Sequence, residues 1–323
     1  MSESGSEEYG MAERKAPDQL AFVLMLFFCL MLALQQVVLK AAADDVAPIL
    51  QLSIRSLIGA VLVGLFMYAR RETVDLRTGN WKPGLLAGLL FMLEYLTLGE
   101  ALRLTSASHA VVFLYTSPVF AALILHFMLP SERMGALQWL GITLAFGGTA
   151  LAFLPAGAGP QGGDAGAVLL GDALALMAGA SWGLTTVLIR TSRLASVSPR
   201  ETLLYQLLVA FVLLLAAAML SGQMAFNPTP LALGSIAFQS VFICFLALMV
   251  WFWLLRHYHA SPIGVMSYLT PVLGVLLGVW LLGEPLEAAF VAGSVMVIGG
   301  VLLVIGAPGI RRWSARLRRG GAF

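Results

Sequence analysis

Residues 107–118 read ASHAVVFLYTSP, and residues 260–271 read ASPIGVMSYLTP. The two stretches lie 153 positions apart in apolar surroundings, and each ends on a proline, Pro118 or Pro271. Aligning the prolines pairs Ala107 with Ala260, Ser108 with Ser261, Tyr115 with Tyr268 and Ser117 with Thr270. With a slip of one residue, the match extends to Glu132 and Glu284 and to the glycine pairs 147–148 and 299–300. This register indicates an internal duplication.

The composition places most of the chain in lipid. The 323 residues are 59% hydrophobic and only 11% charged, whereas a soluble domain has about 25% charged residues. The two cysteines, Cys29 and Cys244, lie in apolar runs. Their number and spacing argue against a disulfide scaffold and against a metal site. We also find no phosphate-binding loop and no catalytic triad, so the sequence predicts neither an enzyme nor a cofactor.

The lengths of the apolar runs predict an all-α membrane protein with ten transmembrane helices. A helix needs about 20 apolar residues to cross the bilayer, whereas a barrel strand needs only about ten. The expected spans are 20–40, 47–69, 83–103, 105–129, 135–155, 167–190, 200–222, 230–256, 260–282 and 287–307. The first run follows a polar segment and has no small-residue cleavage site after it, so we expect a retained helix.

The distribution of positive charge predicts the orientation. With ten spans, 16 of the 19 Lys and Arg residues fall on the side of the two termini. Lys40 and Arg103 fall on the other side, and Arg55 lies inside a span. Because cytoplasmic loops are enriched in Lys and Arg, we expect both termini in the cytoplasm.

The duplication therefore predicts two inverted repeats. Its period contains five spans, and an odd number of crossings turns the second copy upside down relative to the first. Inverted repeats are typical of transporters that work by alternating access. We expect an N-terminal tail (1–18), a first repeat (19–155), an extracytoplasmic linker (156–166), a second repeat (167–308) and a basic tail (309–323).

Pro118 and Pro271 are candidate hinges. Each lies near the middle of a span, removes one amide donor and crowds the carbonyl four residues before it. Such a carbonyl must face protein or a water-lined cavity. The alternative is a static kink that only shapes the packing.

Ionisable groups inside a membrane are costly and are candidate functional residues. Arg55, Glu94 and His109 fall within the expected spans, and Glu100 lies closer to an end. Arg55 either forms a structural ion pair with one of the two glutamates or binds a substrate carboxylate. In the second case Glu94 would bind an ammonium group or carry a proton. His109 is a candidate proton site or a structural hydrogen-bonding group.

Aromatic and amide side chains complete the candidate substrate site. Ser108 and Tyr115 share a helix face, as do their counterparts in the second copy. The tyrosines either line a cavity or bond to neighbouring helices. An aromatic pocket would favour flat apolar groups. The further candidates are Gln35, Gln36, Trp182, Trp251 and Tyr268.

Three stretches resemble the EamA-type repeats of the drug/metabolite transporter superfamily. They are WGLTTVLIR (182–190), the segment 252–304 with its Leu-Gly-Glu-Pro at 282–285, and its partner at 100–124. In the first repeat, Ser131-Glu132-Arg133 replaces Gly-Glu-Pro, and Gln35-Gln36 stands where many members have Trp-Gly. The resemblance implies a five-plus-five inverted repeat in the bacterial cytoplasmic (inner) membrane. The length and the histidine in the fourth span are most similar to the YddG-type aromatic amino-acid exporters.

The sequence thus predicts a secondary transporter or facilitator that exports small metabolites, above all amino acids with aromatic or other apolar side chains. The alternatives are a lipid flippase and a transporter of another class of metabolite, such as a nucleotide sugar or a drug. The expected partners are the small-molecule substrate and membrane lipid, without nucleic acid. We expect a monomer, with a dimer as the alternative.

Overall fold

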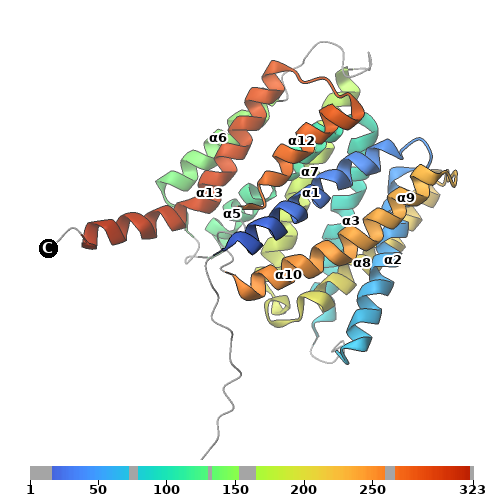
Figure 1. The fold of residues 1–323 in the computed structure, drawn as a ribbon, viewed down its shortest axis with the longest axis horizontal. Coiled ribbons are helices and arrows are strands. Elements are labelled where there is room, and N and C mark those ends of the chain that lie inside the picture. Colours follow the sequence, from blue (N-terminus) through green and yellow to red (C-terminus); the bar gives the residue numbers. More distant parts are fainter. Residues whose placement is uncertain (1–16, 73–78, 130–132, 153–164, 259–265, 321–323) are drawn as a thin grey trace, which may run out of the picture.

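The computed structural model describes residues 17–72, 79–129, 133–152, 165–258 and 266–320, and within them the chain is helical (Figure 1). Val46 and Phe226 form an isolated antiparallel bridge. The linker expected at 156–166 and the tail expected at 1–18 lie largely outside the described residues.

The described residues of the first half of the chain include six α-helices. They are α1 (Gln19–Ala41), α2 (Pro48–Ala69), α3 (Trp81–Leu104), α4 (Ala107–Leu114), α5 (Ser117–Met128) and α6 (Ala136–Ala152). The second half forms α7 (Ala165–Thr191), the 3₁₀ turn η2 (Arg193–Ser196), α8 (Pro199–Leu220), α9 (Pro230–Phe238), the π-helical segment η3 (Gln239–Ala247), α10 (Leu248–His257), α12 (Leu269–Leu282) and α13 (Ala288–Gly320).

Seven helical stretches are long and apolar enough to cross a membrane, including the combined stretches Ala107–Met128 and Pro230–Trp251. Three shorter apolar helices, Ala136–Ala152, Leu269–Leu282 and Ala288–Val304, fall within three further expected spans. Many large apolar side chains on these helices are exposed, as expected where lipid is the solvent. The chain is therefore an all-helical, multi-pass membrane protein.

Local sequence signals fix several of the helix ends. Ser106 caps α4 by accepting a hydrogen bond from the His109 amide at 3.0 Å, and Thr229 caps α9 in the same way. Proline occupies the first turn of α2 and α8, where its missing N–H costs nothing. Gly283 ends α12 in the left-handed conformation, with φ of 65°.

Both copies of the duplicated stretch break the helix just before the proline. In the first copy Tyr115 and Thr116 separate α4 from α5, which contains Pro118 at its start. In the second, Ser267 and Tyr268 form a turn directly before α12, which contains Pro271. Residues 259–265, where much of the second copy lies, are outside the described residues.

The broken backbone of the first copy is covered by protein. A Cβ atom at Gly179 of α7 would lie 2.7 Å from the Phe113 carbonyl and 2.9 Å from the Leu114 carbonyl. Leu114 is the residue whose carbonyl Pro118 leaves without its usual donor. Glycine at position 179 therefore lets α7 approach the break closely.

Two close contacts join helices of the first half to helices of the second half. α6 packs along α13 through glycines, and Gly141 faces the Gly300 carbonyl while Gly148 faces that of Gly293. α2 packs beside α9 and η3, with three hydrogen bonds that each join residues 184 positions apart. A constant separation requires α2 and the α9–η3 segment to run in the same direction. In Figure 1, α13 continues past the end of α6, so the helix extends into the basic segment that begins near residue 309.

Candidate functional site

Arg55 of α2 is fully buried, and η3 supplies its partner. Its Nη1 donates to Gln239 Oε1 at 2.6 Å, and its guanidinium carbon lies 4.4 Å from the centre of the Tyr95 ring. Its Nε and Nη2 have no hydrogen-bond acceptor. An unsatisfied buried guanidinium is costly, so this position is suited to an anionic ligand.

Gln239 begins the π-helical segment, and π-helical turns occur frequently at functional sites. Its Nε2 donates to Ser235 Oγ at 3.2 Å, and Gln51 Nε2 donates to the same hydroxyl. The Gln51 Oε1 atom has no donor. This buried amide network aligns Gln239 towards Arg55.

Glu94 of α3 supplies a carboxyl group near Arg55. It is buried, its Oε2 has no donor, and it lies within electrostatic range of Arg55 and of Tyr115. Of the two alternatives expected for Arg55, the described structure does not contain the ion pair with Glu94 or Glu100, and the hydrogen-bond partner of Arg55 is Gln239. Glu100 instead pairs with Arg103 at 2.7 Å and accepts from Gln223 at 2.5 Å near the end of α3.

The structure brings three of the predicted aromatic residues together. The Tyr115 ring meets Trp182 edge-on at 5.4 Å and Tyr268 edge-on at 6.3 Å between ring centres. Both tyrosines lie at the helix breaks, and Trp182 comes from α7. Glu94 lies within electrostatic range of Tyr115, one member of this aromatic group.

Three further candidates belong to α1 and α10. Trp251 stacks on Phe28 of α1 at 5.1 Å, in a separate apolar cluster with Met25 and Cys29. Gln35 and Gln36 are buried in α1, and Gln36 Oε1 has no donor.

His109 belongs to a buried polar cluster at one end of the bundle. Its Nδ1 lies 2.9 Å from Asp172 Oδ2, and its ring stacks on Phe290 at 3.9 Å. Asp172, Gln239 and the buried Glu284 were not among the predicted site residues. Glu284 accepts from the amides of Ala107 and Ser108 at 2.6 and 2.9 Å and so caps α4.

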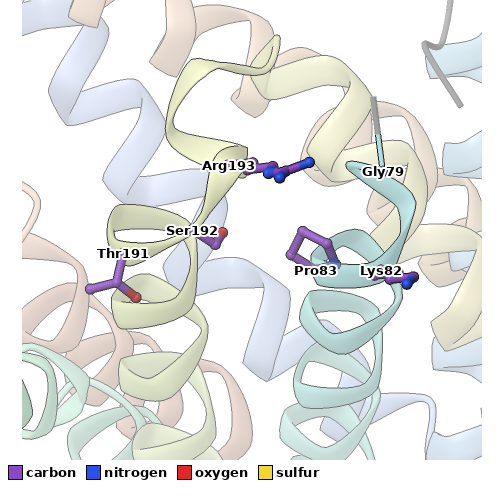
Figure 2. A pocket seen from close by; sticks show the side chains of 6 residues that line it. All are labelled: Gly79, Lys82, Pro83, Thr191, Ser192 and Arg193. Carbon is purple, nitrogen blue, oxygen red and sulfur yellow. The ribbon is translucent and has the colours of Figure 1, made fainter. Parts of the chain in front are cut away.

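One pocket lies away from these candidate residues, and a second reaches only Tyr268 among them. The larger, of about 690 Å³, lies between the start of α3 and the end of α7, as Figure 2 shows, and is lined by Gly79, Lys82, Pro83, Thr191, Ser192 and Arg193. The other, of about 340 Å³, is an apolar groove between α1, α12 and α13, and Tyr268 forms part of its wall. Neither is lined by Arg55, Glu94 or Tyr115.

Within the described residues, no three His, Cys, Asp or Glu side chains converge on a point that suits a metal ion. The candidate site is therefore the group Arg55, Gln239, Glu94, Tyr115, Trp182 and Tyr268. It offers a cation, a carboxyl group, unsatisfied hydrogen-bonding atoms and an aromatic surface, which are means of binding rather than of covalent chemistry.

Comparisons with known proteins agree with this description. The chain is 24% identical over 268 residues to the uncharacterized transporter YoaV of Bacillus subtilis, which covers 83% of this chain and 90% of that protein. It is 28% identical over 291 residues to protein PA1977 of Pseudomonas aeruginosa (90% and 96%) and 25% identical over 276 residues to the inner membrane transporter YedA of Escherichia coli K12 (83% and 85%).

A solved structure at 22% identity superposes with a TM-score of 0.62 over 89% of this chain and 96% of that chain, which shows a shared fold. A profile of the EamA-like transporter family matches the chain twice, at residues 19–154 and 169–306. The two matches cover most of the sequence and coincide with its two halves. The chain belongs to the EamA-like transporter family.

Proposed function

We propose that this protein is a secondary transporter that exports amino acids with aromatic or other apolar side chains. The observation that carries the proposal is the burial of two incompletely bonded groups, the Arg55 guanidinium and the Glu94 carboxyl group, near the aromatic group of Tyr115, Trp182 and Tyr268. Membership of the EamA-like transporter family and relatives named as uncharacterized transporters support the general class.

The chemistry of the group matches a zwitterion. The free Nε and Nη2 of Arg55 present two donors, which suits the two oxygens of a carboxylate. Glu94 Oε2 is an acceptor without a donor and suits an ammonium group. The rings at the helix breaks would bind a flat apolar side chain by stacking and burial.

Ten spans in two inverted repeats explain how the halves contact each other. The contacts between the halves come in pairs. The contact of α3 with α7 has its counterpart in that of η3 and α10 with α1, the contact of α3 with α8 in that of η3 with α2, and the contact of α4 with α7 in that of α12 with α1. In each pair, replacing every helix by its counterpart in the other half turns one contact into the other. The parallel course of α2 and α9 also agrees with this topology, in which both helices cross from outside to inside. The excess of Lys and Arg on the side of the termini supports a cytoplasmic location for both.

In this arrangement Pro118 and Pro271 are the hinges of alternating access. Each follows a break of the helix near the aromatic group, so a rotation there would open the site to one side of the membrane. We propose the monomer as the transporting unit, and Gln35, Gln36 and Trp251 as further residues of the substrate path on α1 and α10.

A lipid flippase is a second candidate because the groove between α1, α12 and α13 is lined by apolar side chains that include the exposed Phe22, Leu26 and Val272. The groove also reaches Tyr268. A nucleotide sugar would need several buried cations. Among the described residues, Arg55 is the one Arg or Lys that is fully buried.

Counterflow of radiolabelled amino acids in proteoliposomes tests the proposal. We expect exchange of aromatic or apolar amino acids by the full-length protein and its loss in Arg55→Ala. Arg103→Ala, which removes an exposed arginine at the end of α3, is the control and retains exchange. Scrambling of labelled phospholipid without exchange of any amino acid would support the flippase instead.

A further inference from the structure

Two carboxylate–hydroxyl contacts occupy related positions in the two halves. The Thr105 hydroxyl donates to Asp172 Oδ1 at 2.5 Å, and the Tyr258 hydroxyl donates to Asp18 Oδ1 at 2.7 Å. Tyr258 follows Thr105 by 153 positions, and Asp172 follows Asp18 by 154 positions. These separations agree with the 153-residue register of the duplicated stretches, so the two contacts are counterparts.

Each contact joins one half to the other. Asp172 stands at the beginning of the second region that matches the family profile, and Thr105 lies within the first region. Asp18 directly precedes the first region and caps α1 through the Ala21 amide at 3.0 Å, whereas Tyr258 lies in the second region.

The two contacts lie at opposite ends of the bundle. Lys40, at the end of α1, donates to the Thr105 carbonyl at 2.8 Å and to the Leu102 carbonyl. Asp18 stands at the start of the same helix, which has 23 residues. A helix rises about 1.5 Å per residue, so about 30 Å or more separates Asp18 from Lys40.

The histidine that contacts the carboxylate of the first pair is not repeated at the equivalent position of the second, where His257, next to Tyr258, lies 2.8 Å from the Trp253 carbonyl instead. His109 Nδ1 lies 3.0 and 2.9 Å from the two carboxylate oxygens of Asp172, which is buried. The residue 153 positions after His109 is Pro262, which has no titratable group. The two ends therefore differ in their chemistry although their carboxylate–hydroxyl contacts are counterparts.

We propose that Asp172–Thr105 and Asp18–Tyr258 are the two gate contacts of alternating access, and that the His109–Asp172 pair is a proton-binding site that controls its gate. The inference rests on the alternating-access transport proposed above. A proton on His109 makes the imidazole a cation beside the Asp172 carboxylate and strengthens the closed gate. Loss of the proton weakens it.

In this mechanism the proton acts from one side of the membrane only. In the proposed topology the His109 end faces the outside. An acidic exterior would close this end after the substrate leaves and favour return of the empty protein to the cytoplasmic side. External protons would then support export by resetting the transporter.

The other charged groups near His109 have partners of their own, so Asp172 is the charged group that pairs with His109. On α1, Lys40 is held by two backbone carbonyls. Glu284, between α12 and α13, is held by the amides of Ala107 and Ser108. On α3, Glu100 and Arg103 pair with each other. In the described side chains of α12 and of α13 up to Val304 there are no ionisable groups.

Accessibility of a single cysteine tests the gates without a substrate. The reporter is Thr116→Cys, at the buried break between α4 and α5, in a full chain with Cys29→Ser and Cys244→Ser. A membrane-impermeant maleimide is added to one side of right-side-out or inside-out vesicles. Thr105→Val and Tyr258→Phe each remove one hydroxyl and preserve the shape of the side chain.

We expect Thr105→Val to raise labelling from the His109 side by about fivefold, the effect of one net hydrogen bond, without a rise from the other side. Tyr258→Phe should show the opposite preference. The control Thr149→Val removes a hydroxyl that bonds within α6 and should change neither rate. A general loss of structure would raise labelling from both sides, so that result, or no change from either side, overturns the gate assignment.

The proton site is tested by the pH on the His109 side. In Thr105→Val, labelling should be slower at pH 6 than at pH 8 relative to the same chain with His109→Gln, a comparison that cancels the pH dependence of the thiol reaction. An equal pH dependence with and without His109 overturns the proton site. If labelling is side-specific as expected but no amino acid is exchanged, the proposed substrate is wrong and the gate assignment still holds. If amino acids are exchanged but labelling is not side-specific, the gate assignment alone is wrong.

Discussion

Arg55 Nη1 and Gln239 Oε1 lie 2.6 Å apart and join the two regions that match the family profile. The amide oxygen of Gln239 occupies one donor of the guanidinium and leaves two others without an acceptor. An incoming carboxylate would therefore add to, or displace, a bond that holds α2 to η3. Binding at Arg55 is in this way coupled to the contact between the two halves.

Gln239→Leu should destabilise the protein, because it leaves the buried guanidinium without its neutral partner. The loss of such a hydrogen bond costs about 1–3 kcal/mol, and we expect a lower melting temperature in detergent. Gln239→Glu should instead raise the melting temperature and weaken substrate binding, because a carboxylate then occupies Arg55 permanently. Gln138→Leu removes a comparable amide, which bonds to the Val304 carbonyl between α6 and α13 at 3.3 Å, and should leave substrate binding unchanged.

Glu94→Gln should reduce transport strongly, and Glu100→Gln should affect it little. Glu94 is buried near the aromatic group, whereas Glu100 forms an ion pair with Arg103 near the helix end. Counterflow of a zwitterionic amino acid measures the binding role, and uptake driven by a pH gradient measures a proton role. Full counterflow by Glu94→Gln would show that the carboxylate does not bind the ammonium group.

The sequence was sufficient to predict features that depend on local chemistry and on hydropathy. The helix breaks occur within four residues before Pro118 and Pro271. They were predictable because a proline has no backbone N–H to donate, whatever the surrounding structure. The burial of Arg55 followed from its place in an apolar run. Among the described residues, seven helical stretches are long enough to cross a membrane and three shorter apolar helices fall within further expected spans, with interruptions such as η3 that the hydropathy pattern did not indicate.

The partners of the site residues could not be predicted, because they depend on how the two halves pack. Gln239 reaches Arg55 from 184 positions away through the parallel register of α2 and α9. Asp172 and Glu284 lie near helix ends, where an acidic residue ordinarily meets water. They are buried because the start of α4 packs against them.

Glu284→Gln should lower the thermal stability by weakening the cap of α4. The carboxylate accepts three hydrogen bonds, from the Ala107 and Ser108 amides and from the Ser108 hydroxyl at 2.5 Å. A carboxylate at a helix N-terminus is also favoured by the helix dipole, by about 0.3–2 kcal/mol. Melting in detergent measures the effect, and Glu287→Gln, three residues away, is the control. Equal melting temperatures for the two variants would contradict the capping role.

Gly179→Ala should impair transport by separating α7 from the helix break that precedes Pro118. The added methyl group would lie 2.7 Å from the Phe113 carbonyl and 2.9 Å from that of Leu114, so the backbone must move. Trp182, on the next turn of α7, would move with it and lose its contact with Tyr115. Gly64→Ala is the matched control, because a Cβ atom at Gly64 of α2 meets nothing within 4 Å, and alanine favours the helix by about 1 kcal/mol over glycine. We therefore expect Gly64→Ala to melt higher with unchanged counterflow and Gly179→Ala to melt lower with reduced counterflow. Normal counterflow in Gly179→Ala would show that transport does not depend on the close approach of α7 to the break.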